Sequence, residues 1–190
     1  MSDPGDHFDD SCCRRAEADD RGHAAGLLPA SVRSGLLSMR ILVEAPPREV
    51  WAWLTRPELL AQWSPIVPDR VLGSEGVATA QESEGSQALD ATVVEVFEPF
   101  RLVHRWGPDT LTWQLGPADT GTQLQLVHDL SDRGAFAGIA AGWHLCFGVL
   151  HARLSGIDTP RLVGAAAMTA GWDGLRDAYR TAIVPNDADD

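Results

Sequence analysis

Residues 142–156 (GWHLCFGVLHARLSG) limit most strongly what this chain can fold into. At about 100° per residue, they place two apolar stripes on one helix. One stripe holds Trp143, Cys146, Phe147, Leu150 and Leu154, and the other holds Leu145, Val149 and Ala152. A helix that is apolar over more than half its circumference is covered on two sides. We therefore predict a helix that is held against a curved sheet and ends near Gly156, since glycine accepts the left-handed cap conformation.

The residues before this helix predict the sheet. Apolar and β-branched residues at 36–44 indicate a first strand, and the segments 47–54 and 57–63 have the inward spacing of two short helices that begin at prolines. Later strands are predicted at 71–72, 77–80, 89–97, 101–106, 111–115 and 122–130. The last three strands alternate apolar and polar residues, as in an antiparallel meander with one buried face.

This order of elements predicts the fold class α+β. The sheet is a curved antiparallel one wrapped around a long C-terminal helix, with two short helices after the first strand. Three glycines at 134, 138 and 142 are expected to lead into the long helix, and a final amphipathic helix is expected at 170–183.

The length of 190 residues suits one domain with tails. Residues 1–35 are acidic, lack periodicity and are expected to be disordered, and a chain starting near Leu36 is expected to keep its full melting temperature. Met39 is an alternative translation start. The domain is predicted over 36–184, and residues 185–190 form a polar tail.

The net charge of −12 disfavours nucleic acid and anionic membrane surfaces as partners. No run of 18 apolar residues suggests a membrane span, and the acidic N-terminus lacks the pattern of a secretory signal. We therefore expect a cytoplasmic protein.

Catalytic and metal sites lack their usual components. His144 and His151 would lie about 10.5 Å apart along a helix, too far for one metal ion. Pairing Trp106 with Leu111 across a four-residue loop at 107–110 would place His104 level with Trp113 and His128 well over about 10 Å away. No nucleophile elbow or phosphate loop is present, and Cys146 lies on an apolar stripe. We expect no catalytic residue, no metal and no other cofactor.

Five short motifs together resemble the START-like helix-grip superfamily, over about residues 39–156. They are residues 45–51 (APPREVW), 57–63 (PELLAQW), 98–106 (EPFRLVHRW), 121–124 (GTQL) and 142–144 (GWH). Within it, the chain is most similar to the branch homologous to the C-terminal domain of the heat-shock-protein-90 ATPase activator. The resemblance implies a hydrophobic cavity between sheet and long helix, in a superfamily that binds lipids, hormones or polyketides and sometimes cyclises polyketides. Where many members carry an Asp after the Gly-Trp-His stretch, this chain has Cys146 and Phe147.

The leading hypothesis is noncatalytic binding of a small hydrophobic molecule. The predicted cavity residues are Trp63, Leu102, His104, Trp106, Trp113, Leu124, His128, Trp143, Phe147 and Leu150. Each inward histidine has two interpretations, a satisfied core residue or a polar group that orients a ligand. Two other functions stay open: a polyketide-type cyclase or aromatase that uses an inward histidine for proton transfer, and a co-chaperone-like module with an acidic face. The sequence leaves a homodimer or another protein partner open.

Overall fold

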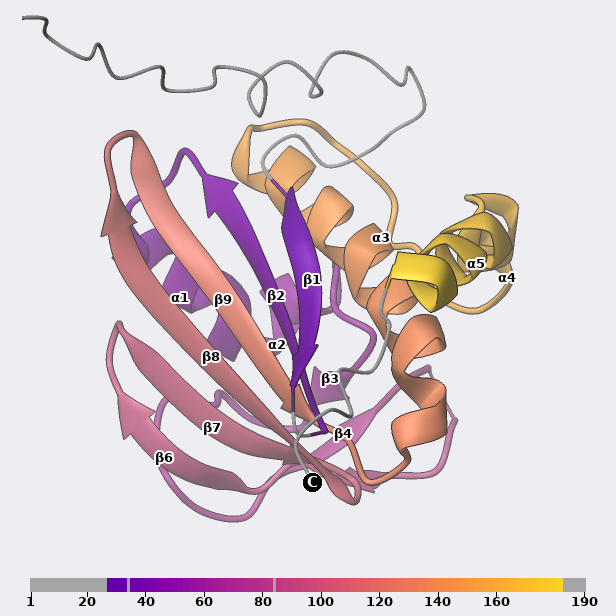
Figure 1. Cartoon of the computed structure of the whole chain (residues 1–190). Coiled ribbons are helices and arrows are strands. Elements are labelled where there is room, and N and C mark those ends of the chain that lie inside the picture. Colours follow the sequence, from indigo (N-terminus) through magenta and orange to yellow (C-terminus); the bar gives the residue numbers. More distant parts are fainter. Residues whose placement is uncertain (1–26, 34, 84, 183–190) are drawn as a thin grey trace, which may run out of the picture.

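The computed structural model describes residues 27–182 except 34 and 84, and it contains the predicted sheet and long helix (Figure 1). The main sheet has six antiparallel strands in the order β1-β2-β9-β8-β7-β6. Their bounds are Leu27–Arg33 (β1), Leu36–Val43 (β2), Gly121–Asp129 (β9), Asp109–Ala118 (β8), Arg101–Trp106 (β7) and Val93–Phe97 (β6).

Alternating side chains give this sheet one buried face, as predicted. Leu124, Leu126 and His128 of β9 are fully buried, and Met39 and Ile41 on the neighbouring β2 are buried beside them. The residues between them on β9 are only partly buried. The period of two in the sequence thus becomes one face that can accept helices.

The two short helices follow β2, as the prolines predicted. Helix α1 spans Pro47–Thr55 and α2 spans Pro57–Leu60, each with proline in its first turn. A small second sheet comes next, made of Val67–Pro68 (β3), Thr79–Gln81 (β4) and Leu89–Asp90 (β5). The predicted strand 89–97 is therefore interrupted at Ala91, whose N–H bonds to Ala78 before the chain enters the main sheet as β6.

The long helix, α3, spans Phe136–Leu154 and is flanked by the sheet on one side and by the C-terminal helices on the other (Figure 1). It begins six residues earlier than predicted, so Gly138 and Gly142 lie inside it. Its buried residues include Trp143, Phe147 and Leu150. The helix-grip fold is confirmed: a curved antiparallel sheet holds a long helix near the C-terminus.

Two further helices follow where one was predicted. Helix α4 spans Ala165–Thr169, α5 spans Trp172–Ala182, and Gly171 between them has φ +93°. A positive φ favours glycine and interrupts a helix. Both helices lie on the side of α3 that faces away from the sheet (Figure 1).

The expectation that residues 1–35 are disordered is wrong for 27–33. These residues form β1, an edge strand that pairs with β2 from Leu27 opposite Ile41 to Arg33 opposite Leu36. Half-buried Ala30 and Val32 pack against the core, which the acidic composition of the whole segment concealed. Residues 1–26 and the predicted tail 185–190 lie outside the described residues.

One helical stretch of the described chain, Arg133–Leu154, is long and apolar enough by length and composition to cross a membrane. It joins a single turn, η1 (Arg133–Ala135), to α3. In this fold, the apolar side chains of α3 pack against the sheet and the other helices. Because α3 is covered on two sides, its apolar composition is that of a helix packed in the core.

Candidate functional site

The structure brings the ten predicted cavity residues together, but it packs most of them into a core. Nine are buried and Trp106 is partly buried. Trp63 lies at the centre, with its ring centroid 6.1 Å from that of Trp113 and 6.5 Å from those of Trp143 and Phe147. The hollow left beside these rings measures about 10 Å³. This hollow has room for about one water and is too small for a ligand.

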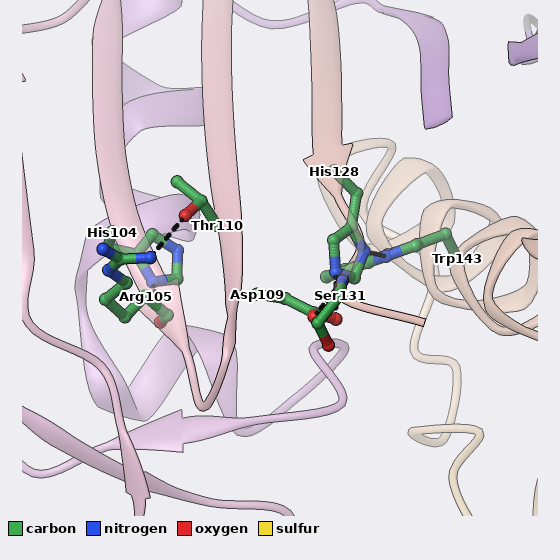
Figure 2. A network of polar contacts seen from close by, with 7 residues as sticks. All are labelled: His104, Arg105, Asp109, Thr110, His128, Ser131 and Trp143. Carbon is green, nitrogen blue, oxygen red and sulfur yellow. Dashed lines mark hydrogen bonds and ion pairs between the residues drawn. The ribbon is translucent and has the colours of Figure 1, made fainter. Parts of the chain in front are cut away.

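His128 belongs to a buried polar chain that runs from α3 to the end of the sheet (Figure 2). The indole N–H of Trp143 donates to Nδ1 of His128 over 3.1 Å. Nδ1 therefore carries no proton, and the hydrogen-bond network assigns the proton to Nε2, which donates to Asp109 Oδ2 at 3.0 Å. Ser131 completes the chain by donating to Asp109 Oδ1 through its N–H at 2.8 Å and its hydroxyl at 2.6 Å.

His104 has the opposite tautomer. The indole N–H of Trp113 donates to Nε2 of His104 over 3.1 Å, so the ring proton is on Nδ1, which donates to the carbonyl oxygen of Arg105 at 2.9 Å. Both ring nitrogens of His104 and both of His128 are hydrogen-bonded within the protein. The geometry favours the interpretation of satisfied core histidines.

Burial sets the charges of this network. Desolvation lowers the pKa of His104 to about 4, against a smaller raising effect from Arg105. Desolvation also lowers the pKa of His128, although its hydrogen bond and proximity to Asp109 oppose the shift. Burial alone would raise the pKa of Asp109, but hydrogen bonds from Ser131 and His128 outweigh it and lower that pKa. At neutral pH the network therefore contains two neutral imidazoles and one carboxylate.

The predicted placement of the histidines is wrong by two residues. The hairpin has a two-residue turn at 107–108, with Trp106 opposite Asp109, so His104 lies opposite Leu111. His128 lies opposite the same Leu111 from the other side. The two histidines are thus at the same level, on strands that flank β8. Within the described part of the chain, no group of three or more His, Cys, Asp or Glu side chains could hold a metal ion.

A larger pocket, of about 790 Å³, lies between α3 and the C-terminal segment. Trp106 and Trp143 are the two predicted residues that line it. The inner wall comes from α3, through Gly138, Ile139, Gly142 and Cys146, and the outer wall comes from Leu162, Val163, Ala167 and Trp172. Polar side chains at this pocket are those of Glu82, Ser83, Arg176 and Arg180.

Trp172 is held in the outer wall by two contacts. Its indole N–H donates to the carbonyl of Gly138 at 3.2 Å, and the guanidinium of Arg176 lies 5.1 Å from its ring centroid. A Cβ at Gly138 would lie 3.2 Å from Trp172 Cζ2, so the absent side chain makes room for the ring. This wall was not predicted from the sequence, although a Gly-x-x-x-Gly spacing followed by a tryptophan 30 residues later could have indicated it.

Cys146 lines the same pocket as a protonated thiol. Burial raises its pKa to about 12, so a thiolate is disfavoured at neutral pH. The side chain supplies apolar surface, as the sequence predicted.

Comparison with known proteins places the fold in a described family. Residues 44–155 match the sequence profile of the family described as Activator of Hsp90 ATPase homolog 1-like protein. No curated protein matches the chain. A solution structure of a protein from Bordetella parapertussis has a TM-score of 0.63 at 20% identity, covering 90% of this chain and 97% of that one.

Two further solved structures share the fold. CalU16 from Micromonospora echinospora has a TM-score of 0.58 at 19% identity, covering 82% of this chain and 94% of its own. DynU16, described as a protein in the dynemicin biosynthetic locus, has a TM-score of 0.58 at 23% identity, covering 67% of this chain and 50% of its own. At these identities the similarity establishes the fold alone.

Proposed function

The chain belongs to the family described as Activator of Hsp90 ATPase homolog 1-like protein, and from this premise we propose that it binds one small hydrophobic molecule between α3 and the C-terminal helices. The observation that carries the proposal is the pocket of about 790 Å³, with walls that are mostly apolar. Its volume falls within the range of about 300–1,000 Å³ of small-molecule sites. Two partly buried tryptophans, Trp106 and Trp172, offer flat apolar surfaces to such a ligand.

The location differs from the cavity that the sequence suggested. The space between sheet and α3 is filled by Trp63, Trp113, Trp143 and Phe147. The ligand therefore binds in the pocket between α3 and the C-terminal segment, which Trp106 and Trp143 also line. Because the family match ends at residue 155, the outer wall is built by the part of this chain that follows the family domain.

Binding without catalysis fits the chemistry of the lining residues. The cyclase hypothesis needs a histidine that exchanges a proton with the ligand. His104 and His128 have both ring nitrogens bonded within the protein, and neither lines the large pocket. Cys146, which does line it, is held as a thiol.

Native mass spectrometry of the freshly purified full chain tests the proposal directly. We expect an added mass that persists under gentle conditions and is lost on denaturation. If the preparation has been stripped of ligand, the neutral fluorescent probe N-phenyl-1-naphthylamine should bind with a blue-shifted emission. A complex with a protein that weakens steeply with salt, combined with failure of the probe to bind, would instead support the co-chaperone hypothesis.

A substitution pair locates the site. Gly142→Leu places a large side chain in the pocket and should weaken probe binding by at least about tenfold, equivalent to about 1.4 kcal/mol. Ala152→Leu, on the same helix but not among the lining residues, should leave binding within about twofold. Equal affinities for the two variants would contradict the assigned location.

A further inference from the structure

A second hollow, of about 510 Å³, adjoins the apolar pocket and has a different chemistry. Its polar lining consists of Asp69, Thr79, Gln81, Ser83 and Arg161. Four of these side chains can donate hydrogen bonds and four can accept them. The hollow therefore suits a polar group, whereas the pocket between α3 and the C-terminal helices suits an apolar one.

The two hollows share a boundary. Ser83 lines both of them. Arg161 lines the polar hollow, and the next residue along the chain, Leu162, lines the apolar pocket. The side chain of Arg161 also bonds to the carbonyls of Pro65 and Glu82, two residues that line the apolar pocket. The two hollows therefore meet at Ser83 and at the Arg161–Leu162 step.

Arg161 is held at this boundary by three hydrogen bonds and has further donor groups that these bonds do not use. Its Nε donates to Ser64 O at 2.7 Å, and its Nη2 donates to Pro65 O and Glu82 O, both at 2.9 Å. Its Nη1 has no hydrogen bond to a described residue. Three carbonyls thus hold the guanidinium in one orientation, which leaves the Nη1 protons available to a ligand without further ordering cost.

The charges of the polar hollow balance. Asp69 accepts from the N–H and the hydroxyl of Thr79, both at 3.0 Å, and these bonds lower the pKa of its carboxyl group. A carboxylate and a guanidinium therefore line the same hollow. An anionic ligand would face Asp69 and the net charge of −12 of the chain, and a cationic ligand would face Arg161. An uncharged group that both donates and accepts hydrogen bonds avoids both penalties.

We propose that the two hollows form one site for an uncharged amphipathic molecule, with an apolar ring system between α3 and α5 and a hydroxyl-rich end beside Arg161. This inference rests on the proposed function and specifies the ligand class. The apolar body supplies affinity through buried area, and the polar end supplies specificity through Arg161 Nη1 and the groups around it.

A matched pair of probes tests the ligand class by isothermal titration calorimetry at pH 7. The probes are 2-naphthol and 2-naphthyl β-D-glucoside, which share the apolar ring and differ in a neutral sugar. We expect the full chain to bind the glucoside about tenfold tighter than naphthol, a difference of about 1.4 kcal/mol.

Two substitutions should remove this preference, so that the glucoside and naphthol bind each variant with affinities that agree within about twofold. Ala88→Trp fills the polar hollow from an exposed position without changing Arg161, and Arg161→Met removes the donors at nearly constant length. Ala61→Trp, at an exposed alanine that lines neither hollow, is the matched control and should keep the preference.

The outcomes separate the two proposals. If naphthol does not bind to the wild-type chain, the proposed function fails and this inference fails with it. If naphthol binds but the glucoside binds no tighter, or if Ala88→Trp keeps the preference, the ligand class is wrong while the apolar site stands.

Discussion

The indole N–H of Trp143 lies 3.1 Å from Nδ1 of His128 and donates a hydrogen bond to it inside the core (Figure 2). This contact joins α3 to β9 through two buried side chains. Apolar packing alone tolerates small rotations of a helix, whereas a buried hydrogen bond has one satisfied geometry. The pair therefore fixes which face of α3 meets the sheet.

Replacing Trp143 with Phe should destabilise the protein. The change leaves Nδ1 of His128 buried without its donor, which costs about 1–3 kcal/mol, and it also removes ring volume from the core. Urea denaturation of the two chains measures the difference. Trp106→Phe is the control, because the Trp106 indole N–H has no hydrogen bond to a described residue and that side chain is only partly buried. Equal losses in the two variants would show that the hydrogen bond contributes nothing.

Acid should weaken the fold before the carboxylates titrate. The pKa of His104 is lowered from 6.5 to about 4 in the folded chain, so below pH 6.5 the unfolded chain takes up a proton that the folded chain refuses. Stability is then complete above pH 6.5 and falls by about 3 kcal/mol as the pH approaches 4. His128, whose pKa is also lowered, acts in the same direction.

Denaturant titrations at pH 7.0 and 4.5 measure this dependence. His104→Gln, which keeps an acceptor for the Trp113 N–H but cannot titrate, should show a shallower decline than the wild type. A wild-type free energy of unfolding that is the same at both pH values would contradict the assignment of a neutral, buried His104.

The two glycines inside α3 should respond differently to alanine. A Cβ at Gly142 has its nearest neighbour at 3.9 Å, so Gly142→Ala should raise the free energy of unfolding by about 0.5–1 kcal/mol through helix propensity. A Cβ at Gly138 would lie 3.2 Å from the ring of Trp172, which is anchored by its own hydrogen bond. Gly138→Ala should therefore lower stability. Thermal denaturation of both variants measures the contrast. An equal gain in stability at both positions would show that Trp172 does not pack closely against Gly138.

Removal of residues 1–33 should lower the melting temperature, contrary to the expectation from composition. The deletion removes β1 and exposes the edge of β2, with its row of backbone groups. A loss of about 2 kcal/mol corresponds to a decrease of roughly 4–8 °C for a domain of this size. A deletion that stops at residue 26 is the control and leaves β1 intact. Equal melting temperatures for the two deletions would mean that β1 contributes no stability.

The sequence predicted the fold well where side-chain period determines structure. Alternation in β8 and β9 and the two apolar stripes of α3 both follow from periodicity. The register of the β7–β8 hairpin was harder, because the loop can close with two or four residues and each choice shifts the pairing. In the structure, Gly107 has φ +55° and the two-residue turn forms, which places His104 opposite Leu111.

The candidate site was predicted only in part, for a physical reason. Ten apolar and aromatic side chains that point into a fold can enclose a cavity or fill it, and composition does not distinguish the two. Trp63 and Phe147 fill it here. The actual pocket depends on Trp172 approaching α3 at Gly138, a contact between residues far apart in sequence. Local propensity does not reveal this contact, because glycine is unfavourable inside a helix.

All the strands that the structure describes precede α3 in the chain, and the last of them ends at Asp129. A ribosome therefore finishes the sheet before it synthesises the most apolar helix, which meets a ready acceptor surface as it emerges. Its second covering, α5, arrives about 20 residues later. The order of synthesis thus shortens the time during which this apolar helix is exposed to aggregation and to membrane targeting.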